Sequence, residues 1–529
     1  MARLRARFGG KGSATAPRFS TWVRLSACAI TIAAILLSGT PAQASPPAPV
    51  VFTHGVASGD VTPVSAVLWT RLNQEVKVHV EVSTNPDFVG PRLRRAAFAS
   101  AEDDFTVKVL VGGLTPDQVY YYRWRARGVV SEVGNFRTAP LSSVPADLRF
   151  AYTGDSDGTK VLGLPFFNSF ETLEAARLEG LDFFVYLGDT IYADSLIRPA
   201  PATTLDDYRD AYKMNRGYER LRDILGATST YAIWDDHEVY NDFDAATVDP
   251  ARYANGLEAF REYMPIASSF SLHDSTCRSD PMFRVVHWGA EADIIILDER
   301  SCRSAEAAAP CTLNGTADLA PTLPAQLRVI LGLPASPPPG CLAAIADLTR
   351  TFLGPVQKAA FLASLQSSTA RYKFVMNEDP IQQFFALPYD RWEGYAAERL
   401  EVLNFIRTNA IPNVVFLTTD THAVIMNRVF VDRFTDPAPI AYEAITGPIA
   451  TFTFEFEVLR LGGPSALAAL QGILTFLGVD CRNLNVFSYG VVDVDPATGR
   501  ATITMKDGTG AVVHDQVTPA VACTTTLGP

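Results

Sequence analysis

Side chains that bind metal ions or transfer protons follow five apolar runs of the sequence, each within a few residues of the end of the run. The runs are LRFAYTG, FFVYLG, STYAIW, YKFVM and NVVFLTT. The side chains that follow them are Asp155; Asp189 and Tyr192; Asp235, Asp236 and His237; Asn377 and Glu378; and Asp420 and His422. If the runs are strands of an open α/β sheet, their carboxyl ends meet at the edge where such sheets bind ligands. Carboxylate, phenolate and imidazole groups gathered there suit Fe³⁺ or another hard cation.

The stretch FFVYLGDTIYAD, residues 183–194, is the centre of this pattern. Its five apolar or aromatic residues predict a buried strand. Gly188 then releases the backbone, so that Asp189 and Tyr192 can turn toward one point. Each acid in the pattern has an alternative role as the N-cap of a following helix. Capping explains a single position such as Asp155 or Asp420 better than it explains all five groups, and we therefore favour a shared metal site.

The spacing within the groups suggests separate roles. Asp420 and His422 are two residues apart and can face the same way on an extended backbone, so both are predicted ligands. Asp235 and Asp236 are adjacent and point apart, and we expect Asp236 to bind metal while Asp235 supports the site. His237 is the candidate for protonating a leaving group or orienting a phosphoryl oxygen.

Asp189 lies in the middle of this order and is the candidate for a carboxylate shared by two cations. Two cations held a few ångströms apart activate water and neutralise the charge that develops in an in-line displacement at phosphorus. The predicted metal ligands are Asp155, Asp189, Tyr192, Asp236, Asp420 and His422, and the predicted catalytic residues are His237 and Asp236.

The elements that position these residues change character along the chain. Residues 45–140 contain strand-like runs separated by Gly, Pro, Asp and Asn, which predicts a small β-sandwich of immunoglobulin or fibronectin type. A Pro- and Ser-rich linker follows, and strands then alternate with helical segments through residues 148–529, which predicts a layered α/β domain. Residues 305–339 are rich in Ala, Pro and Leu and read as an insertion, while residues 487–513 predict a β-hairpin.

The first 44 residues predict a cleaved signal peptide. A basic region precedes a short apolar run and the small-residue site Ala42-Gln43-Ala44, and an uncleaved membrane anchor is the alternative. Six of the 45 basic residues lie in this segment and none of the 57 acidic ones, so 39 basic residues remain, with a net charge of −18. Such a charge disfavours nucleic-acid binding. We therefore expect a secreted or periplasmic protein with no later transmembrane segment, and the oligomeric state is left open.

Six cysteines remain after removal of this segment, which in an exported chain suggests disulfides, with fifteen possible pairings. Their spacing matches no zinc pattern. We expect Cys302, Cys311 and Cys341 to secure the predicted insertion.

Several ordered blocks of the chain resemble the PhoD-type alkaline phosphatases and phosphodiesterases, a branch of the calcineurin-like metallophosphoesterases. The blocks are FTHGVASGDVTPVSAVLWTRL, GDTIYAD, WDDHE, FLGPVQKAAFL, YDRWEGYAAER and TTDTHA. The resemblance implies a four-layer α/β/β/α metallophosphoesterase domain behind an N-terminal β-sandwich. It also implies Fe³⁺ with Ca²⁺, hydrolysis of phosphate mono- or diesters, metal binding by Asp189, Tyr192, Asp236, Asp420 and His422, and a place for His237 beside the phosphate.

The chain departs from this family pattern at two places. The family often has cysteine where this chain has Asp155. Aspartate can still bind a metal ion, but its oxygen is a harder ligand than a cysteine sulfur. Mn²⁺ or Ca²⁺ therefore becomes a stronger alternative to iron, and Zn²⁺ is also possible. Asn377 and Glu378 stand where relatives mostly have glutamine, and their role is open. Asp390, Trp392 and Tyr395 are expected to shape the pocket rather than to bind metal.

Two other functions are compatible with the sequence. One is a phospholipase D-like phosphodiesterase, because residues 305–339 and 448–463 could present apolar surface to lipid. The other is a secreted, calcium-stabilised adhesion protein without catalysis, which the complete ligand set and His237 disfavour. A serine esterase lacks support because no Gly-x-Ser-x-Gly motif occurs.

Overall fold

The computed structural model describes residues 49–330 and 332–528, and Val50–Pro529 form one compact unit. The predicted signal peptide lies outside the described residues. Within those residues, every helix is too short or too polar to cross a membrane.

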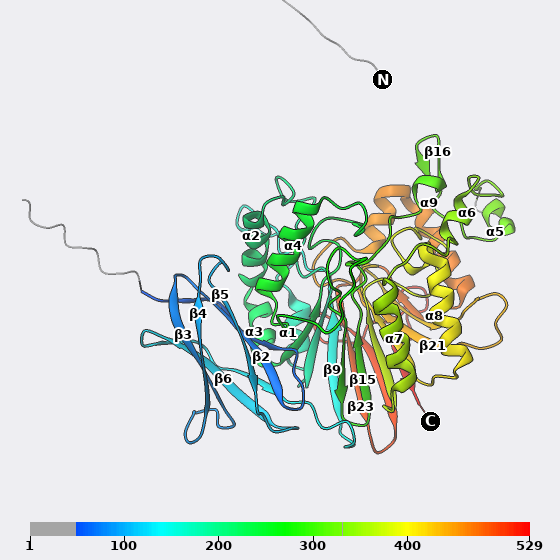
Figure 1. The fold of residues 1–529 in the computed structure, drawn as a ribbon. Coiled ribbons are helices and arrows are strands. Elements are labelled where there is room, and N and C mark those ends of the chain that lie inside the picture. The colour runs from blue at the N-terminus through cyan, green and yellow to red at the C-terminus, as the bar shows by residue number, and fades with distance from the viewer. Residues whose placement is uncertain (1–48, 331, 529) are drawn as a thin grey trace, which may run out of the picture. The chain divides into compact units, whose positions relative to one another are not determined.

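A nine-stranded sheet carries three of the five predicted strand ends (Figure 1). Its strands, in spatial order, are β25 (Thr524–Leu527), β24 (Arg500–Asp507), β23 (Ser488–Asp495), β9 (Leu148–Thr153), β12 (Phe183–Leu187), β13 (Ser229–Ile233), β1 (Phe52–Gly59), β2 (Ser65–Leu72) and β5 (Thr106–Gly112). Strands β9, β12, β13 and β1 run parallel. Tyr186 pairs with Thr153 and Leu187 with Ile233, so these strands end side by side. The predicted hairpin is formed by β23 and β24.

A seven-stranded sheet carries the other two predicted strand ends. Its order is β14 (Arg284–Trp288), β15 (Ala292–Ile296), β18 (Tyr372–Asn377), β19 (Val414–Thr418), β21 (Ala441–Ile445), β20 (Val424–Val429) and β22 (Cys481–Asn483). The strands β15, β18, β19 and β21 are parallel, and Asn377, Thr418 and Ile445 end in register. Both sheets therefore present the carboxyl ends of several strands at an edge. The residue pattern predicted one edge of a single sheet, whereas the five strands are divided between two sheets.

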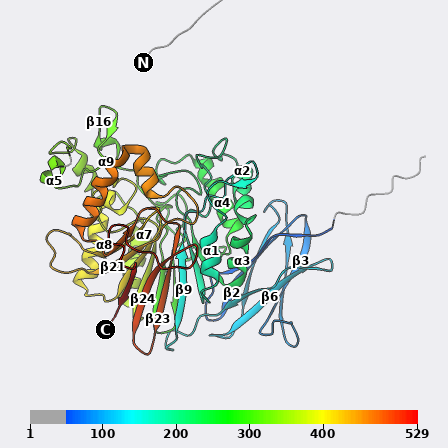
Figure 2. The same cartoon turned by 180° about the vertical axis from the view of Figure 1, so that it is seen from behind.

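Apolar side chains pack the two sheets against each other and against helices. Phe150 of β9 meets Phe374 of β18 edge-on, with ring centroids 5.4 Å apart. The outer side of the nine-stranded sheet packs on α1 (Glu171–Arg177), α2 (Leu205–Arg216), α3 (Glu219–Ala227) and α4 (Pro250–Tyr263). The seven-stranded sheet packs on α7 (Pro355–Ser367) and α8 (Ala396–Thr408). Figure 2 shows these two groups of helices on opposite sides of the central strands.

The N-terminal strands form a second apolar core. A five-stranded sheet contains β4 (Leu93–Ala99), β3 (Val76–Ser83), β6 (Val119–Ala126) and β7 (Val129–Val130), with β8 (Gly134–Arg137) paired to β6. Its apolar face, which includes Val78 and Trp124, packs with Leu68 of β2 and Val111 of β5. Because β1, β2 and β5 also belong to the nine-stranded sheet, this sandwich shares strands with the layered region. The predicted division of the chain near residue 140 stays a prediction.

Three disulfides close loops of 25, 30 and 42 residues in sequence separation: Cys277–Cys302, Cys311–Cys341 and Cys481–Cys523. The second closes the predicted insertion. The expectation that Cys302 also secures this segment is wrong, since Cys302 lies beside Cys277. The insertion contains η1 (Ala309–Cys311), β16 (Thr312–Leu313), β17 (Thr316–Ala317) and α5 (Ala325–Ile330), and α6 (Cys341–Ile345) follows it.

Three further elements surround the edge where the strands end. The hairpin β10 (Lys160–Val161) and β11 (Leu164–Pro165) follows β9, and η2 (Trp392–Tyr395) precedes α8. The helix α9 (Phe454–Leu477) is interrupted at Gly463, whose φ is 68°, directly before Pro464. Because proline cannot continue the preceding hydrogen-bond pattern, the two halves of α9 meet at a kink.

Candidate metal centre

Four of the six predicted ligands sit in strained backbone positions just beyond their strands. Asp155, Asp189, Asp420 and His422 all have positive φ angles, from 47° to 58°. A non-glycine residue in this region costs about 1–3 kcal/mol and is found where the surrounding structure imposes it, often at functional sites. The four residues therefore adopt a backbone conformation that is intrinsically unfavourable for them and that the surrounding structure imposes.

Two glycines allow the ligand-bearing loops to lie in contact. A Cβ atom on Gly154 would come 2.3 Å from the carbonyl oxygen of Leu187. A Cβ on Gly188, whose φ is 72°, would come 2.7 Å from the Cβ of Asp235. Since real Cβ atoms do not approach so closely, only glycine lets the loops after β9, β12 and β13 pack this tightly.

The close packing produces two adjoining groups of ligand atoms. Asp155, Asp189 and His422 each offer one such atom within 4.8 Å of the others, and Asp189, Asp236 and His237 do the same. Asp189 belongs to both groups. Asp189 is thus common to two groups of potential ligand atoms, and its role as a shared carboxylate stays a prediction.

Several oxygen atoms in these groups are buried without a hydrogen-bond partner. They are both carboxylate oxygens of Asp155, Oδ2 of Asp189 and Oδ1 of Asp236. Burial raises the pKa of Asp155 to about 7, against the opposing effect of His422, and it raises the pKa of Asp189 well above its usual range. Burying an ionised carboxylate that accepts no hydrogen bond costs free energy unless the carboxylate is paired with a positive charge or binds a metal ion. These side chains therefore fit a pair of bound cations, which would favour the ionised form of the carboxylates.

Tyr192 lies between the two histidines. Its phenol oxygen is 2.8 Å from Nε2 of His422, and its ring stacks on that of His237 with centroids 4.0 Å apart. Burial raises the pKa of Tyr192 well above its usual value, with Asp189 adding to the effect. A phenolate at this position therefore requires a cation beside it.

His237 is held by a carboxylate that the sequence analysis did not single out. Its Nδ1 lies 2.5 Å from Oδ1 of Asp194, while Oδ2 of Asp194 accepts a hydrogen bond of 2.7 Å from the backbone of Asn241. Burial lowers the pKa of His237, but Asp236, Asp194 and Asp189 outweigh it and raise the pKa well above its usual value. Because Nδ1 is engaged, Nε2 is the ring nitrogen available for proton transfer. The position of Asp194 within the central stretch was the only signal for it in the sequence.

Asp235 is bound by a buried arginine, which fits the supporting role that we predict for it. It accepts a hydrogen bond from Nε of Arg300. The same guanidinium donates to both oxygens of Asp390, at 2.9 and 2.7 Å, and Arg303 also binds Asp390. Trp392 donates to Glu299 and to Asn377, so this tryptophan and Asp390 brace the site. The two arginines were not foreseen, because nothing in their local sequence ties them to Asp235.

Asp420 and Glu378 lie at the margin of the two ligand groups. Asp420 falls in a neighbouring group with Asp379 and Asp390, and Nε of Arg391 is 3.8 Å from its carboxylate. It is thus near the centre, but the structure does not place it within either group around Asp189. Glu378 is buried, and burial followed by the charge of Glu299 raises its pKa.

A cavity of about 650 Å³ opens over these side chains. Its lining includes Tyr192, Asp236, His237, Asp420 and His422. The lining also includes carboxylates, two arginines, and apolar and aromatic residues, among them Asp157, Asp194, Asp242, Glu306, Asp390, Glu457, Arg391, Arg460, Leu196, Leu319, Leu387, Leu461 and Phe452. The cavity is large enough for a small phosphate ester and offers both cationic and apolar contacts.

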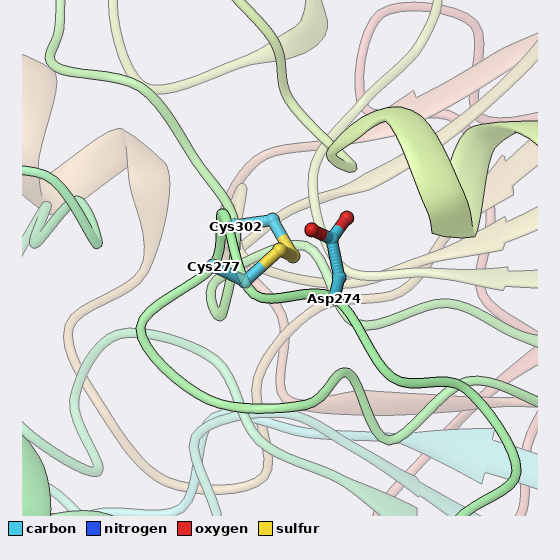
Figure 3. Close-up of side chains that lie close together, drawn as sticks. All are labelled: Asp274, Cys277 and Cys302. Atoms are coloured by element: carbon cyan, nitrogen blue, oxygen red, sulfur yellow. A yellow bond between two sulfur atoms is a disulfide. The ribbon is translucent and has the colours of Figure 1, made fainter.

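A separate cluster of side chains of the types that bind metals, around Asp274, does not fit a cation. Asp274, Cys277 and Cys302 lie close together, but Figure 3 shows the two sulfur atoms joined in a disulfide. Asp274 accepts hydrogen bonds from the backbone and hydroxyl of Thr276 and from the backbone of Val356. No thiolate is available, and the carboxylate is satisfied.

Comparison of the sequence with known protein families identifies the class of protein to which this site belongs. The sequence model of the PhoD-like phosphatases matches residues 160–498, and the model of their N-terminal domain matches residues 38–140. The chain therefore belongs to the PhoD-like phosphatase family, as its resemblance implied.

Individual relatives agree with this membership. The chain is 28% identical over 425 residues to alkaline phosphatase D of Bacillus subtilis (strain 168), a match that covers 72% of this chain and 66% of that protein, slightly less than two thirds. A solved structure of PhoD shares 24% identity, with a TM-score of 0.69 over 90% of this chain and 89% of that one. The purple acid phosphatase PPD1 from yellow lupin seeds shares 12% identity, with a TM-score of 0.55 over 90% and 74%. The two structures share the fold of this chain.

Proposed function

We propose that this protein is an exported, metal-dependent phosphoesterase that hydrolyses phosphate mono- or diesters. The observation that carries the proposal is the position of Asp189 in two ligand groups, with buried carboxylate oxygens that lack hydrogen-bond donors. Membership in a family of phosphatases and the likeness to an alkaline phosphatase D support it. The catalytically inactive adhesion protein is disfavoured, because such a protein has no need for His237 to be held by Asp194.

The first cation would be held by Asp155, Asp189 and His422, with the phenol of Tyr192 beside His422, and the second by Asp189 and Asp236. Asp420, the remaining predicted ligand, lies outside both groups. Phenolate and carboxylate ligands favour Fe³⁺ for the first position, and an all-oxygen set favours Ca²⁺ for the second, with Mn²⁺ or Zn²⁺ as alternatives. Bound cations would supply Lewis acidity at phosphoryl oxygens and lower the pKa of a water molecule.

The protein's own residues would bind the ester and move the proton. Arg391 lines the cavity beside Asp420 and can bind a phosphoryl oxygen. His237, oriented by Asp194 through Nδ1, can deliver a proton from Nε2 to the leaving alkoxide. The buried position of Tyr192 against His237 limits the rotation of the imidazole ring.

The finer features of the fold support the same assignment. We infer a four-layer α/β/β/α catalytic domain behind an immunoglobulin-like sandwich, because helices pack on the outer side of each of the two central sheets. Three disulfides favour an oxidising compartment, in agreement with export through the predicted signal peptide.

A phosphodiesterase that removes lipid head groups is the second candidate. Both segments that the sequence suggested for lipid contact reach the cavity, with Leu319 from the insertion and Leu461 from α9 in its wall. Turnover of a phosphomonoester, a soluble phosphodiester and phosphatidylcholine distinguishes the candidates. Efficient monoester cleavage without lipid hydrolysis removes the second one.

Elemental analysis of protein purified without chelators, combined with this substrate panel, tests the proposal. We expect about two metal ions per chain and activity that a chelator abolishes. Fe³⁺ bound to Tyr192 gives a visible charge-transfer band, which the Tyr192→Phe variant loses. A colourless and fully active wild-type enzyme would remove iron–phenolate ligation, and a metal-free active enzyme would remove the proposed function.

A further inference from the structure

An aromatic groove of about 600 Å³ opens beside the cavity of the metal centre. Phe167 meets Phe452 edge-on with ring centroids 4.9 Å apart, and Phe452 stacks on Phe456 at 4.6 Å. Phe166 meets Phe167 edge-on, also at 4.9 Å. We call these four side chains and the space they line the phenylalanine groove.

The phenylalanine groove is continuous with the metal centre. Thr451 and Phe452 line both the groove and the cavity. The backbone just before them is bound to the loop that carries Asp155, since Ala450 donates to the carbonyl of Asp155 at 3.0 Å. A ligand whose phosphate lies at the metal-binding side chains can therefore extend over Phe452 into the groove.

Several polar side chains around the groove already have partners, whereas the hydroxyl of Thr172, which also lines it, is buried without one. Asn168 donates from its amide to the carbonyl of Ile449 at 2.8 Å, and the amide oxygen of Asn485 accepts from the hydroxyl of Thr453 at 2.9 Å. Asp507 accepts hydrogen bonds from the turn that it begins. Binding a nucleobase edge would require such groups to be vacant, whereas a hydrocarbon chain requires none. The lining therefore favours a hydrocarbon.

Two of the four rings are exposed, and further apolar side chains lie near them in the chain. Phe166 and Phe456 are 45% and 46% exposed, and the neighbouring hairpin β10–β11 carries Leu162 at 98% and Leu164 at 70%. Large apolar side chains gathered at one surface mark binding sites more often than single exposed ones do.

We propose that the phenylalanine groove binds the hydrocarbon part of an amphiphilic phosphate ester whose phosphate lies at the metal centre. This inference rests on the proposed function and narrows its substrate class to phosphate esters that carry an alkyl or acyl chain. Because apolar contacts with phenylalanine rings are non-directional, the groove selects for the length of the hydrocarbon chain of the ligand rather than for a particular polar group.

Alkylphosphonates test the groove without turnover, because their carbon–phosphorus bond is not an ester. Binding of methylphosphonate and octylphosphonate to the metal-loaded full-length protein is measured by calorimetry, below the concentration at which octylphosphonate forms micelles. Full burial of a methylene strengthens binding about fourfold, so partial burial of seven predicts a ratio of affinities on the order of 10² in favour of octylphosphonate.

The double variant Phe166→Ala/Phe456→Ala should reduce this ratio to less than about tenfold, since it removes the two exposed rings. Phe98→Ala is the matched control, because Phe98 is 58% exposed on β4, away from the groove, and the ratio should remain as in the wild type. Circular dichroism and thermal unfolding establish that each variant is folded.

Equal affinity of the wild type for both phosphonates overturns the inference, as does a ratio that survives in the double variant. A large ratio that the double variant loses supports the groove, whatever the enzyme hydrolyses. If that result accompanies no hydrolysis of any phosphate ester, the proposed function fails while the groove stands.

Discussion

The clusters around Asp189 and around Asp274 contain similar side chains and differ in how their atoms are used. Both bring three potential ligand atoms within 4.8 Å. Around Asp274 the sulfurs form a disulfide and the carboxylate accepts hydrogen bonds from Thr276 and Val356. Around Asp189 the carboxylate oxygens of Asp155 and one oxygen of Asp189 are buried without a donor.

The difference shows that proximity of acids and cysteines does not by itself define a metal site. A cation binds where carboxylate lone pairs are free of hydrogen bonds and where burying those carboxylates would cost free energy if no cation were bound. The backbone strain at Asp155 and Asp189 points the same way, because the fold holds both residues in a conformation that they disfavour.

The largest effect is expected for Asp189→Asn. Replacing a carboxylate shared by two cations removes charge from both sites, so we expect loss of bound metal and a fall in kcat/KM on the order of 10³-fold or more. Elemental analysis and turnover of a phosphomonoester measure both. Wild-type metal content and rate in this variant would show that Asp189 is not a shared ligand.

His237→Ala should keep the metal and lose rate. Since His237 is proposed to transfer a proton rather than to bind a cation, we expect a decrease in kcat of about 10²- to 10⁴-fold with unchanged metal content. A substrate with a good leaving group, such as a nitrophenyl ester, needs less protonation and should be less affected. Loss of metal in His237→Ala would instead make this histidine a ligand.

Asp194→Asn should have a smaller effect, because Asp194 acts through His237. Residues that orient a side chain of the site from outside it typically contribute a factor of about 10 to 100 to activity. The amide can still accept from Nδ1 of His237 but carries no charge, so we expect a decrease in kcat in this range, with little change in KM. An equal decrease for substrates with good and poor leaving groups would contradict a role through the proton donor.

The smallest effect is expected for Asp274→Asn, which we predict to change metal content and activity less than about twofold. Burial raises the pKa of Asp274, but hydrogen bonds from Thr276 and Val356 outweigh it and lower the pKa below its usual value. The ionised carboxylate therefore contributes stability above the unfolded pKa of about 3.9, and this contribution is lost as the pH falls through the lower folded pKa.

The thermal midpoint of Asp274→Asn should accordingly lie about 1–3 °C below that of the wild type at pH 7, with a smaller difference near pH 3. A loss of bound metal in this variant would show that the Asp274 cluster also binds a cation, and the proposed difference between the two clusters would be wrong.

Much of the site could be predicted because strand periodicity and strand ends are local properties. The run FFVYL and the residues that follow it predict a buried strand with Asp189 at its carboxyl end, and β12 has these bounds. The choice of Asp235 as a support rather than a ligand also agrees with its bond to Arg300. The expectation that Cys302 secures the insertion was wrong, because the partner of a cysteine, here Cys277, depends on how distant loops pack.

Other features required tertiary contacts. Arg300 reaches Asp235 across 65 residues, and the phenylalanine groove joins Phe166 to Phe452, far apart in the chain. Such contacts follow from the order of strands in the two sheets, which periodicity does not specify.

By itself, the amino-acid sequence determined which residue types stand at the strand ends, and hence that hard cations and phosphate chemistry suit this chain. The tertiary structure decided which of those residues meet. It placed Asp189 between two ligand groups, held His237 with Asp194, and left Asp420 at the margin. The physical reason is that local sequence sets the direction of a strand and its end, whereas distances between loops depend on packing across the whole core.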